Sequence, residues 1–273
     1  MAVARRRRRR TRRTGAAARG RRRAGAGIVL RRVLLALAAA IALLTLNLAY
    51  QIARKPAELL FPVSGMLRKQ PAQTWATYGE AFRRNSTALI PAELLAALAQ
   101  GEGAGDPLAH TYWRFAWSAH PLELYRPASS AVGMYQLTDA AYAQARHYCI
   151  RAHQVVPAAD WRDWHGCWHG GLYLRVLPED AIELTAAYLD LNVAAILRER
   201  PRPPPRETER LATLVHLCGP AVAAAYARRG YQLGVGERCG AHDPRAYLKR
   251  IGLLRAQFAR LAQQEAMGEG RGG

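Results

Sequence analysis

Residues 33–50 form an uncharged run of 18 residues in which only Thr45 and Asn47 are strongly polar. A run of this length just reaches across the hydrocarbon core of a bilayer. Fourteen of the 40 basic residues precede Val33, and no acidic residue does. Because basic residues are retained in the cytoplasm, the sequence predicts a transmembrane signal-anchor at 33–50, with a cytoplasmic N-terminus and the chain after Tyr50 outside.

A cleaved signal peptide is the alternative interpretation of this run. Its most apolar part is short, and its alanines could provide a cleavage site. We favour the uncleaved anchor, because the whole run is longer than the apolar region of a usual signal peptide. In either case the body of the protein is exported.

The formal net charge of +20 is unevenly distributed along the chain. Residues 1–32 contain the arginine tract and no periodic apolar residues, which predicts a disordered cytoplasmic tail. The remaining 26 basic and 20 acidic residues leave the rest of the chain only mildly basic. Because this basic tail lies beside a membrane span, we interpret it as a topology signal that adheres to anionic lipid rather than as a nucleic-acid-binding segment. We therefore expect no nucleic-acid partner.

Residues 51–70 contain Pro56, Pro62 and Gly65 among scattered charges, which indicates a juxtamembrane linker with room for one short helix. Apolar residues at helical spacing follow, and no long run of alternating β-branched residues is present. Helices are expected from Pro71, before Gln100, after Thr138, and at 179–198, 207–217, 221–229 and 244–264. The sequence therefore predicts one mostly α-helical domain at 71–267.

Glu102 is the candidate catalytic residue of this domain. Leu94, Leu95 and Leu98 recur at helical spacing, and the glycine-rich residues 101–105 end that helix. The helix dipole disfavours a carboxylate at this end, and apolar neighbours remove its hydration, so both effects favour the protonated acid. A protonated carboxyl group can act as a general acid in glycosidic bond cleavage. The local sequence alone fits a solvated loop glutamate better.

Three further stretches follow in order. Residues 129–138 (SSAVGMYQLT) form a small-residue turn that opens a helix, residues 215–220 read VHLCGP, and residues 243–251 read DPRAYLKRI. With Glu102, they resemble the Glu-Ser, Gly-Leu-Met-Gln, Ala-Tyr-Asn-Ala-Gly-Pro and Glu-Thr-Arg-x-Tyr-Val motifs of the soluble lytic transglycosylase (SLT) domain family. The resemblance covers residues 91–258, and the order of four weak motifs carries it.

The resemblance implies a lysozyme-like fold and a membrane-anchored lytic transglycosylase, held in the bacterial inner membrane by residues 33–50 with its domain in the periplasm. Such an enzyme cleaves the β-1,4 bond between N-acetylmuramic acid and N-acetylglucosamine in peptidoglycan strands and forms a 1,6-anhydro ring. Glu102 would be the general acid and base, and neither a cofactor nor a metal is expected. The implied substrate-binding residues are Ser129, Ser130, Met134, Tyr135, Gln136, His216 and Tyr247.

The chain departs from the SLT pattern at several positions. Gly103 replaces the usual serine after the glutamate, Tyr135 stands where methionine is usual, and His216 and Leu217 replace a Tyr-Asn pair. His216 could be a polar substrate contact or a core histidine. Residues 108–126 also lengthen the gap between Glu102 and Gln136.

Two other functions therefore stay open. A lysozyme-type muramidase would hydrolyse the same bond with a second acid, for which Asp106, Glu123 and Asp139 are candidates. A non-catalytic, membrane-tethered peptidoglycan-binding protein could use the aromatic residues in 110–117 (HTYWRFAW) to stack on sugars. Alternatively, these aromatic residues fold that loop onto the body.

The cysteines are even in number, as expected for an exported protein, and can pair in three ways. We expect the sequential disulfides Cys149 with Cys167 and Cys218 with Cys239, because each closes a short loop. A zinc site is the competing interpretation, prompted by residues 165–169 (HGCWH) with His147 and His153 nearby. These residues lack two well-spaced ligand pairs, so no metal site is predicted.

Overall fold

The computed structural model describes residues 2–158, 175–198 and 203–269, and these are mostly helical, as predicted. The helices are α1 Ala2–Arg54, η1 Pro56–Val63, α2 Pro71–Arg84, α3 Ala92–Gly103, η2 Pro121–Glu123, α4 Asp139–Ala145, α5 Pro178–Leu197, α6 Pro205–Cys218, α7 Pro220–Arg228 and α8 Pro244–Glu269, where η marks a 3-10 helix. Two short sheets pair β1 (Trp113–Phe115) with β2 (Tyr125–Pro127), and β3 (Tyr148–Arg151) with β4 (Gln154–Pro157). Each helix that the sequence predicts after residue 70 is present.

The chain divides into two compact units. The first contains Met1–Arg54 and Phe115–Arg126, and the second contains Lys55–Arg114 and Pro127–Gly273. We call the first the anchor unit and the second the body. The segment Phe115–Arg126, here named the insertion loop, therefore belongs with α1 rather than with the body.

Helix α1 carries the apolar run. Its segment Ile28–Arg54 has 27 residues and is long and apolar enough to cross a membrane. The large apolar side chains from Ile28 to Leu48 are 46–63% exposed to solvent. A long helix whose large apolar side chains are mostly exposed has the length and composition of a membrane span.

Helix α1 also extends back to Ala2, through the arginine tract that the sequence predicts to be disordered. Arginine and alanine are both good helix formers, so a helix that is nucleated in the apolar run can propagate into this tract without tertiary contacts. The expectation of disorder came from the absence of an apolar face, and such a face is needed for packing rather than for helix propagation.

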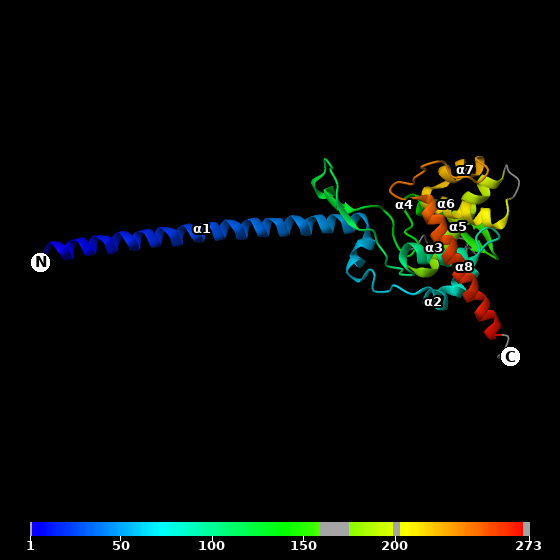
Figure 1. Ribbon diagram of the computed structural model, residues 1–273, viewed down its shortest axis with the longest axis horizontal. Coiled ribbons are helices and arrows are strands. Elements are labelled where there is room, and N and C mark those ends of the chain that lie inside the picture. The colour runs from blue at the N-terminus through cyan, green and yellow to red at the C-terminus, as the bar shows by residue number, and fades with distance from the viewer. Residues whose placement is uncertain (1, 159–174, 199–202, 270–273) are drawn as a thin grey trace. The chain divides into compact units, whose positions relative to one another are not determined.

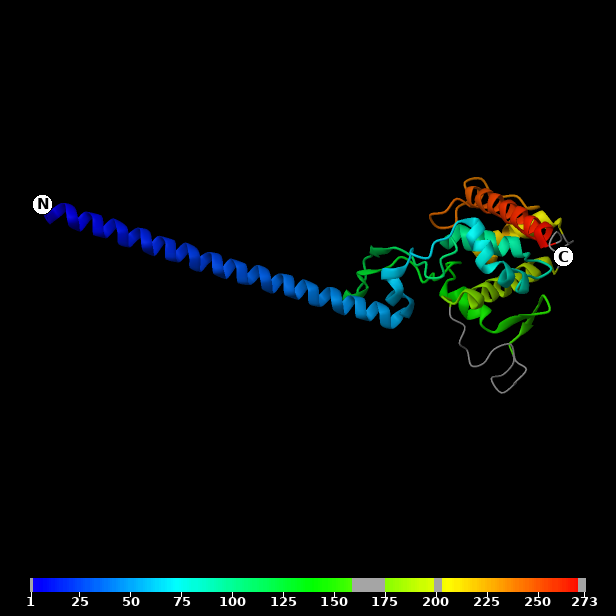
Figure 2. The same cartoon turned by 90° about the horizontal axis from the view of Figure 1, so that it is seen from below.

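Helix α3 lies at the centre of the body. The side chains from Leu95 to Ala99 have no exposed surface, and α2, α5 and α8 all pack against α3. Both views show α8 beside α3 (Figures 1 and 2). The close approach is possible because a Cβ at Gly101 would lie 2.5 Å from Ile251 Cδ1. Gly101 thus allows α8 to lie close to the end of α3 that carries Glu102.

Helix ends follow the local sequence. Thr138 caps α4 by accepting a hydrogen bond from Ala141 N, and Asp243 Oδ1 caps α8 by accepting one from Arg245 N at 2.8 Å. Proline stands at the first position of α2, α5, α6, α7 and α8, where its missing N–H costs nothing. The predicted caps at Thr138 and Asp243 are confirmed.

The segment after α1 is bound to the body, whereas the sequence indicates a linker at 51–70. Residues 51–54 complete α1, and η1 follows. Glu58 is 1% exposed, forms an ion pair with Lys55 at 2.7 Å and accepts a hydrogen bond from Trp113 Nε1 at 2.8 Å. Lys69 N donates to Ala104 O at 2.8 Å. The helix η1 is thus the one short helix for which the sequence leaves room, and the contacts of Glu58 and Lys69 attach this segment to the body.

Candidate functional site

Glu102 lies in the last turn of α3, as the sequence predicts, and its side chain is 19% exposed. Its Oε1 accepts a hydrogen bond from Tyr247 Oη at 2.5 Å. The two residues are 145 positions apart in the chain, and the packing of α8 against α3 brings them together. The first and last predicted motifs thus meet at one carboxylate.

Tyr247 and Arg250 lie one turn apart on α8. Tyr247 is 6% exposed, and the Arg250 guanidinium lies 5.1 Å from the centre of its ring. Burial, followed by the adjacent Glu102 carboxylate, raises the pKa of Tyr247 well above its ordinary value. Its hydroxyl therefore stays protonated and keeps donating to Glu102. Arg250 itself lies 3.9 Å from Glu102 Oε1.

The second motif packs against the end of α3 through backbone atoms. A Cβ at Gly103 would lie 2.9 Å from both the Cα and the carbonyl oxygen of Met134. Gly133 has a φ of 78°, and a Cβ there would lie 2.1 Å from Arg175 O. This close contact explains why glycine stands at position 103.

Gln136 ends this turn with a φ of 49°. Its Nε2 donates to the carbonyl oxygens of Ala109 and Gly133, each at 3.0 Å. With the amide nitrogen held by the backbone, the orientation of the Gln136 side chain is fixed. Gln136 and Glu102 line the same pocket.

The pocket at Glu102 has a volume of about 300 Å³. It is lined by Ser64, Gly65, Arg68, Gln100, Gly101, Glu102, Gly103, Ala104, Asp106, Ala109, His110 and Gln136. Three of these, Ser64, Gly65 and Arg68, come from the segment that the sequence indicates as a linker. No pattern in the sequence marks them as site residues, and sequence reasoning missed them. The pocket can admit a polar ligand, and its lining includes the partly exposed Glu102 carboxylate and the cationic Arg68.

Asp106 is the only other carboxylate among the lining residues. It is fully buried, its Oδ2 accepts from Gly65 N at 2.6 Å, and its Oδ1 accepts from Leu108 N at 2.8 Å. Both oxygens therefore hold loop backbone in place. Of the other predicted second acids, Asp139 is 69% exposed and pairs with Arg175 at 2.8 Å, and Glu123 lies in the anchor unit, where it pairs with Arg54.

The third motif contributes His216, near the end of α6. The side chain is half-buried. Burial lowers the pKa of His216, and the Glu102 carboxylate acts in the opposite direction. His216 is thus a neutral imidazole at neutral pH that interacts electrostatically with Glu102, although it does not line the pocket.

The remaining predicted binding residues lie outside the pocket lining. Met134 and Tyr135 have no exposed side-chain surface, and burial raises the pKa of Tyr135 well above its ordinary value. Ser129 Oγ accepts from Ala131 N at 3.2 Å, and Ser130 Oγ accepts from Asp139 N at 3.1 Å. In this structure these four residues shape the turn that presents Gln136, and their role in binding substrate stays a prediction.

Each of the other three motifs contributes one residue near the Glu102 carboxylate: Gln136, His216 and Tyr247. No protein-family model matches this chain, and no curated protein matches it. Membership of the SLT family stays a prediction.

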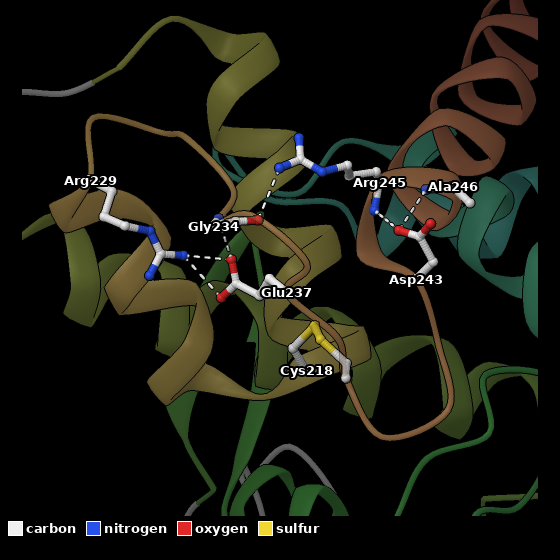
Figure 3. Close-up of a disulfide and its surroundings, with 8 residues drawn as sticks. Cys218, Arg229, Gly234, Glu237, Asp243, Arg245 and Ala246 are labelled. Carbon is white, nitrogen blue, oxygen red and sulfur yellow. Dashed lines mark hydrogen bonds and ion pairs between the residues drawn. A yellow bond between two sulfur atoms is a disulfide. The ribbon is translucent and has the colours of Figure 1, made fainter.

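The predicted disulfide between Cys218 and Cys239 is present and links the end of α6 to the loop before α8. Figure 3 shows the polar contacts of this loop. Arg229 pairs with Glu237 at 2.7 Å, and Glu237 also accepts from Gly234 N at 2.7 Å. The disulfide and these contacts fix the loop that leads into α8, and therefore support the position of Tyr247.

The other predicted pair cannot be described in the same way. Cys149 is fully buried and is a disulfide cysteine, whereas Cys167 lies outside the described residues. His165 and His169 also lie outside them. Among the residues that the structure describes, no group of three His, Cys, Asp or Glu side chains is arranged to hold a metal ion.

Proposed function

We propose that the protein is a membrane-anchored lytic transglycosylase with a lysozyme-like body, and that it cleaves peptidoglycan strands at the bond between N-acetylmuramic acid and N-acetylglucosamine. The observation that carries this proposal is the hydrogen bond from Tyr247 to Glu102, which joins the last motif to the first. The shared pocket of Glu102 and Gln136 supports it further.

In the first step, protonated Glu102 donates its proton to the bridging oxygen as the bond from this oxygen to the anomeric carbon of muramic acid breaks. N-Acetylglucosamine leaves with a free 4-hydroxyl group. The positive charge at the anomeric carbon is stabilised by the acetamido oxygen of the same sugar, as in substrate-assisted glycosidases.

In the second step, ionised Glu102 removes the proton from the C6 hydroxyl of muramic acid. This oxygen attacks the anomeric carbon and closes the 1,6-anhydro ring. Glu102 ends the cycle protonated, as it began, and no water is consumed. One carboxyl group is therefore sufficient for the whole reaction.

The neighbours of Glu102 have distinct tasks in this scheme. Tyr247 donates to Oε1 and leaves Oε2 to exchange the proton with substrate, and its raised pKa keeps it a donor. Gln136 has its amide nitrogen held by backbone, so its carbonyl oxygen is available for a sugar hydroxyl. Arg68 and Arg250 offer cations to the carboxylates of the substrate.

The environment of Asp106 favours this reaction over hydrolysis by a lysozyme. A hydrolase of the inverting two-carboxylate kind needs a second carboxylate that is free to activate water. Both oxygens of Asp106 accept backbone N–H groups, and the side chain is fully buried. Asp106 thus holds residues 65 and 108 in place and is not free to activate water.

We further propose that α1 spans the bacterial inner membrane, with the N-terminus in the cytoplasm and the body in the periplasm. The length and apolar character of Ile28–Arg54 and the arginines before it support this orientation. The disulfide between Cys218 and Cys239 agrees with an oxidising compartment.

The proposal is tested by incubating the purified full-length protein with peptidoglycan and identifying the soluble sugars by mass spectrometry. Glu102→Gln tests the acid, and Glu93→Gln, in the first turn of the same helix, is the matched control. We expect anhydro-muramyl products from the wild type and from Glu93→Gln, and none from Glu102→Gln. Reducing ends instead would show a lysozyme, and glycan binding without cleavage by any of the three would show a binding protein.

A further inference from the structure

Helix α1 has one polar strip in its apolar segment, and the insertion loop covers it. Asn47 and Gln51 lie one turn apart and are 7% and 5% exposed, whereas their apolar neighbours are exposed. Asn47 Nδ2 donates to Leu122 O at 2.8 Å, and Gln51 Nε2 donates to the same oxygen at 2.7 Å. One loop carbonyl oxygen therefore accepts hydrogen bonds from both buried side-chain amides.

Further contacts bind the loop to the same part of α1. The rings of Tyr50 and His120 stack with their centres 5.1 Å apart, and Arg54 pairs with Glu123. Within the loop, Ser118 donates a hydrogen bond to Glu123 at 3.3 Å. The views agree that the insertion loop lies beside the C-terminal end of α1 (Figures 1 and 2). The loop is thus specifically docked on α1.

The docked loop leaves large aromatic side chains uncovered. Trp117 is 99% exposed and Phe115 is 81% exposed, and the Phe115 ring contacts the Tyr125 ring with centres 4.7 Å apart. Leu124 is 37% exposed. Apolar side chains gathered on one short loop mark an interaction surface.

The position of the insertion loop along α1 indicates which environment surrounds the loop. The hydrocarbon core takes about 20 helical residues, so a span that starts at Val33 ends near Ile52. A span that starts at Ile28, where the apolar segment begins, ends near Asn47, so Asn47 lies between the outer boundary of the core and about 8 Å inside it. A carbonyl that pairs with Asn47 must therefore reach the membrane interface. In lipid, the amides of Asn47 and Gln51 need such a partner, because no water is present to replace it.

We propose that the insertion loop is a membrane-interface element that places Trp117 and Phe115 in the outer leaflet of the bilayer, beside the outer end of α1. This inference rests on the proposed span of α1 but is independent of the proposed catalytic reaction. Tryptophan is well suited to this depth, because its apolar ring enters the lipid while its N–H faces polar headgroups.

The same aromatic residues could in principle stack on sugars. The contacts of the loop favour lipid, because every polar contact named above joins it to residues 47–54 of the apolar helix or lies within the loop itself.

The test uses the full-length protein in vesicles that contain phosphatidylcholine brominated either near the glycerol end or near the methyl end of the acyl chain. Bromine quenches tryptophan fluorescence at short range. We compare the wild type with Trp117→Phe and with Trp113→Phe, whose tryptophan lies four residues earlier in the sequence and donates to Glu58 of the body. Because Trp117 is almost fully exposed, its replacement leaves the fold intact.

We expect bromine near the glycerol end to quench the wild type and Trp113→Phe, and most of this quenching to disappear in Trp117→Phe. Equal quenching in all three proteins would overturn the inference, as would loss of peptidoglycan binding by Trp117→Phe with lipid quenching unchanged. Flotation with the vesicles after alkaline carbonate treatment checks the span separately. A wild type that does not float would refute the span, and the inference with it.

Discussion

At the scale of single residues, Gly103 decides whether the second motif can reach Glu102. A Cβ at this position would lie 2.9 Å from the Met134 backbone, which cannot move aside as a flexible side chain could. We expect Gly103→Ala to lower the free energy of unfolding by about 1–3 kcal/mol, the usual cost of overpacking. Denaturant unfolding of the full-length protein in detergent measures it.

Gly252 provides the matched control for this substitution. It lies in α8, and a Cβ there would meet no atom within 4 Å. Gly252→Ala is expected to stabilise the protein by up to about 1 kcal/mol, because alanine favours the helix. Equal effects of the two substitutions would show that helix propensity, and not the contact with Met134, governs position 103.

Tyr247 acts through its hydroxyl group. Tyr247→Phe removes the donor to Glu102 Oε1 and keeps the ring that packs in the body. A hydrogen bond to a charged group contributes about 1.5–3 kcal/mol, so we expect the cleavage rate to fall about 10-fold to 100-fold. The release of soluble muropeptides over time measures the rate. An unchanged rate with an unchanged melting temperature would remove Tyr247 from the proposed mechanism.

His216 predicts a dependence of stability on pH. Its pKa is lowered from 6.5 in the folded protein, chiefly by burial, so the unfolded chain binds a proton that the folded protein does not. The stability that neutral His216 provides is complete above pH 6.5 and is lost as the pH falls toward the lowered value. We expect the denaturation midpoint to fall less steeply below pH 6.5 in His216→Gln than in the wild type. Parallel curves would contradict this prediction.

At the scale of elements, the disulfide between Cys218 and Cys239 constrains the chain between α6 and α8. The two cysteines are 21 residues apart, and closing a loop of this size stabilises the folded protein by about 3 kcal/mol in the chain-entropy treatment. We therefore expect the double substitution Cys218→Ser and Cys239→Ser to lower the free energy of unfolding by about this amount. Denaturant unfolding under non-reducing conditions measures it, and no change would mean that the contacts of Glu237 hold the loop alone.

Sequence patterns were sufficient to predict the helices of the body. Apolar periodicity and the caps at Thr138 and Asp243 depend on near neighbours in the chain, so they are visible in the sequence. The strands β3 and β4 were not predicted, because the turn between them lacks the residues that usually mark a turn in the sequence. Their turn uses Ala152 and His153 with φ of 46° and 63°, whereas glycine or asparagine usually marks a turn of this kind.

The site was predictable only in part. The motifs identified Glu102, Gln136 and Tyr247, which the structure brings to one place. Gly65 and Arg68 line the same pocket, but the contacts that bring them there, such as that from Gly65 N to Asp106, join residues 41 positions apart. A contact between distant loop residues leaves no periodic signal in the sequence.

At the scale of the whole molecule, the proposed span of α1 determines on which side of the membrane the body is expected to work. Fourteen basic residues precede the apolar run, so the body is expected outside the cytoplasm. A C-terminal fusion to alkaline phosphatase, which needs export to become active, should be active in cells, and the same fusion to green fluorescent protein should be dark. A bright fluorescent fusion with an inactive phosphatase would reverse the orientation.

In the proposed reaction, Glu102 closes an anhydro ring without water, and one measurement tests this step most directly. The full-length protein is given peptidoglycan in water enriched in oxygen-18, and the masses of the released sugars are recorded. The proposed reaction predicts anhydro-muramyl products that carry no heavy oxygen and are absent with Glu102→Gln. Products that carry one heavy oxygen at the new reducing end would contradict the account, because they require hydrolysis.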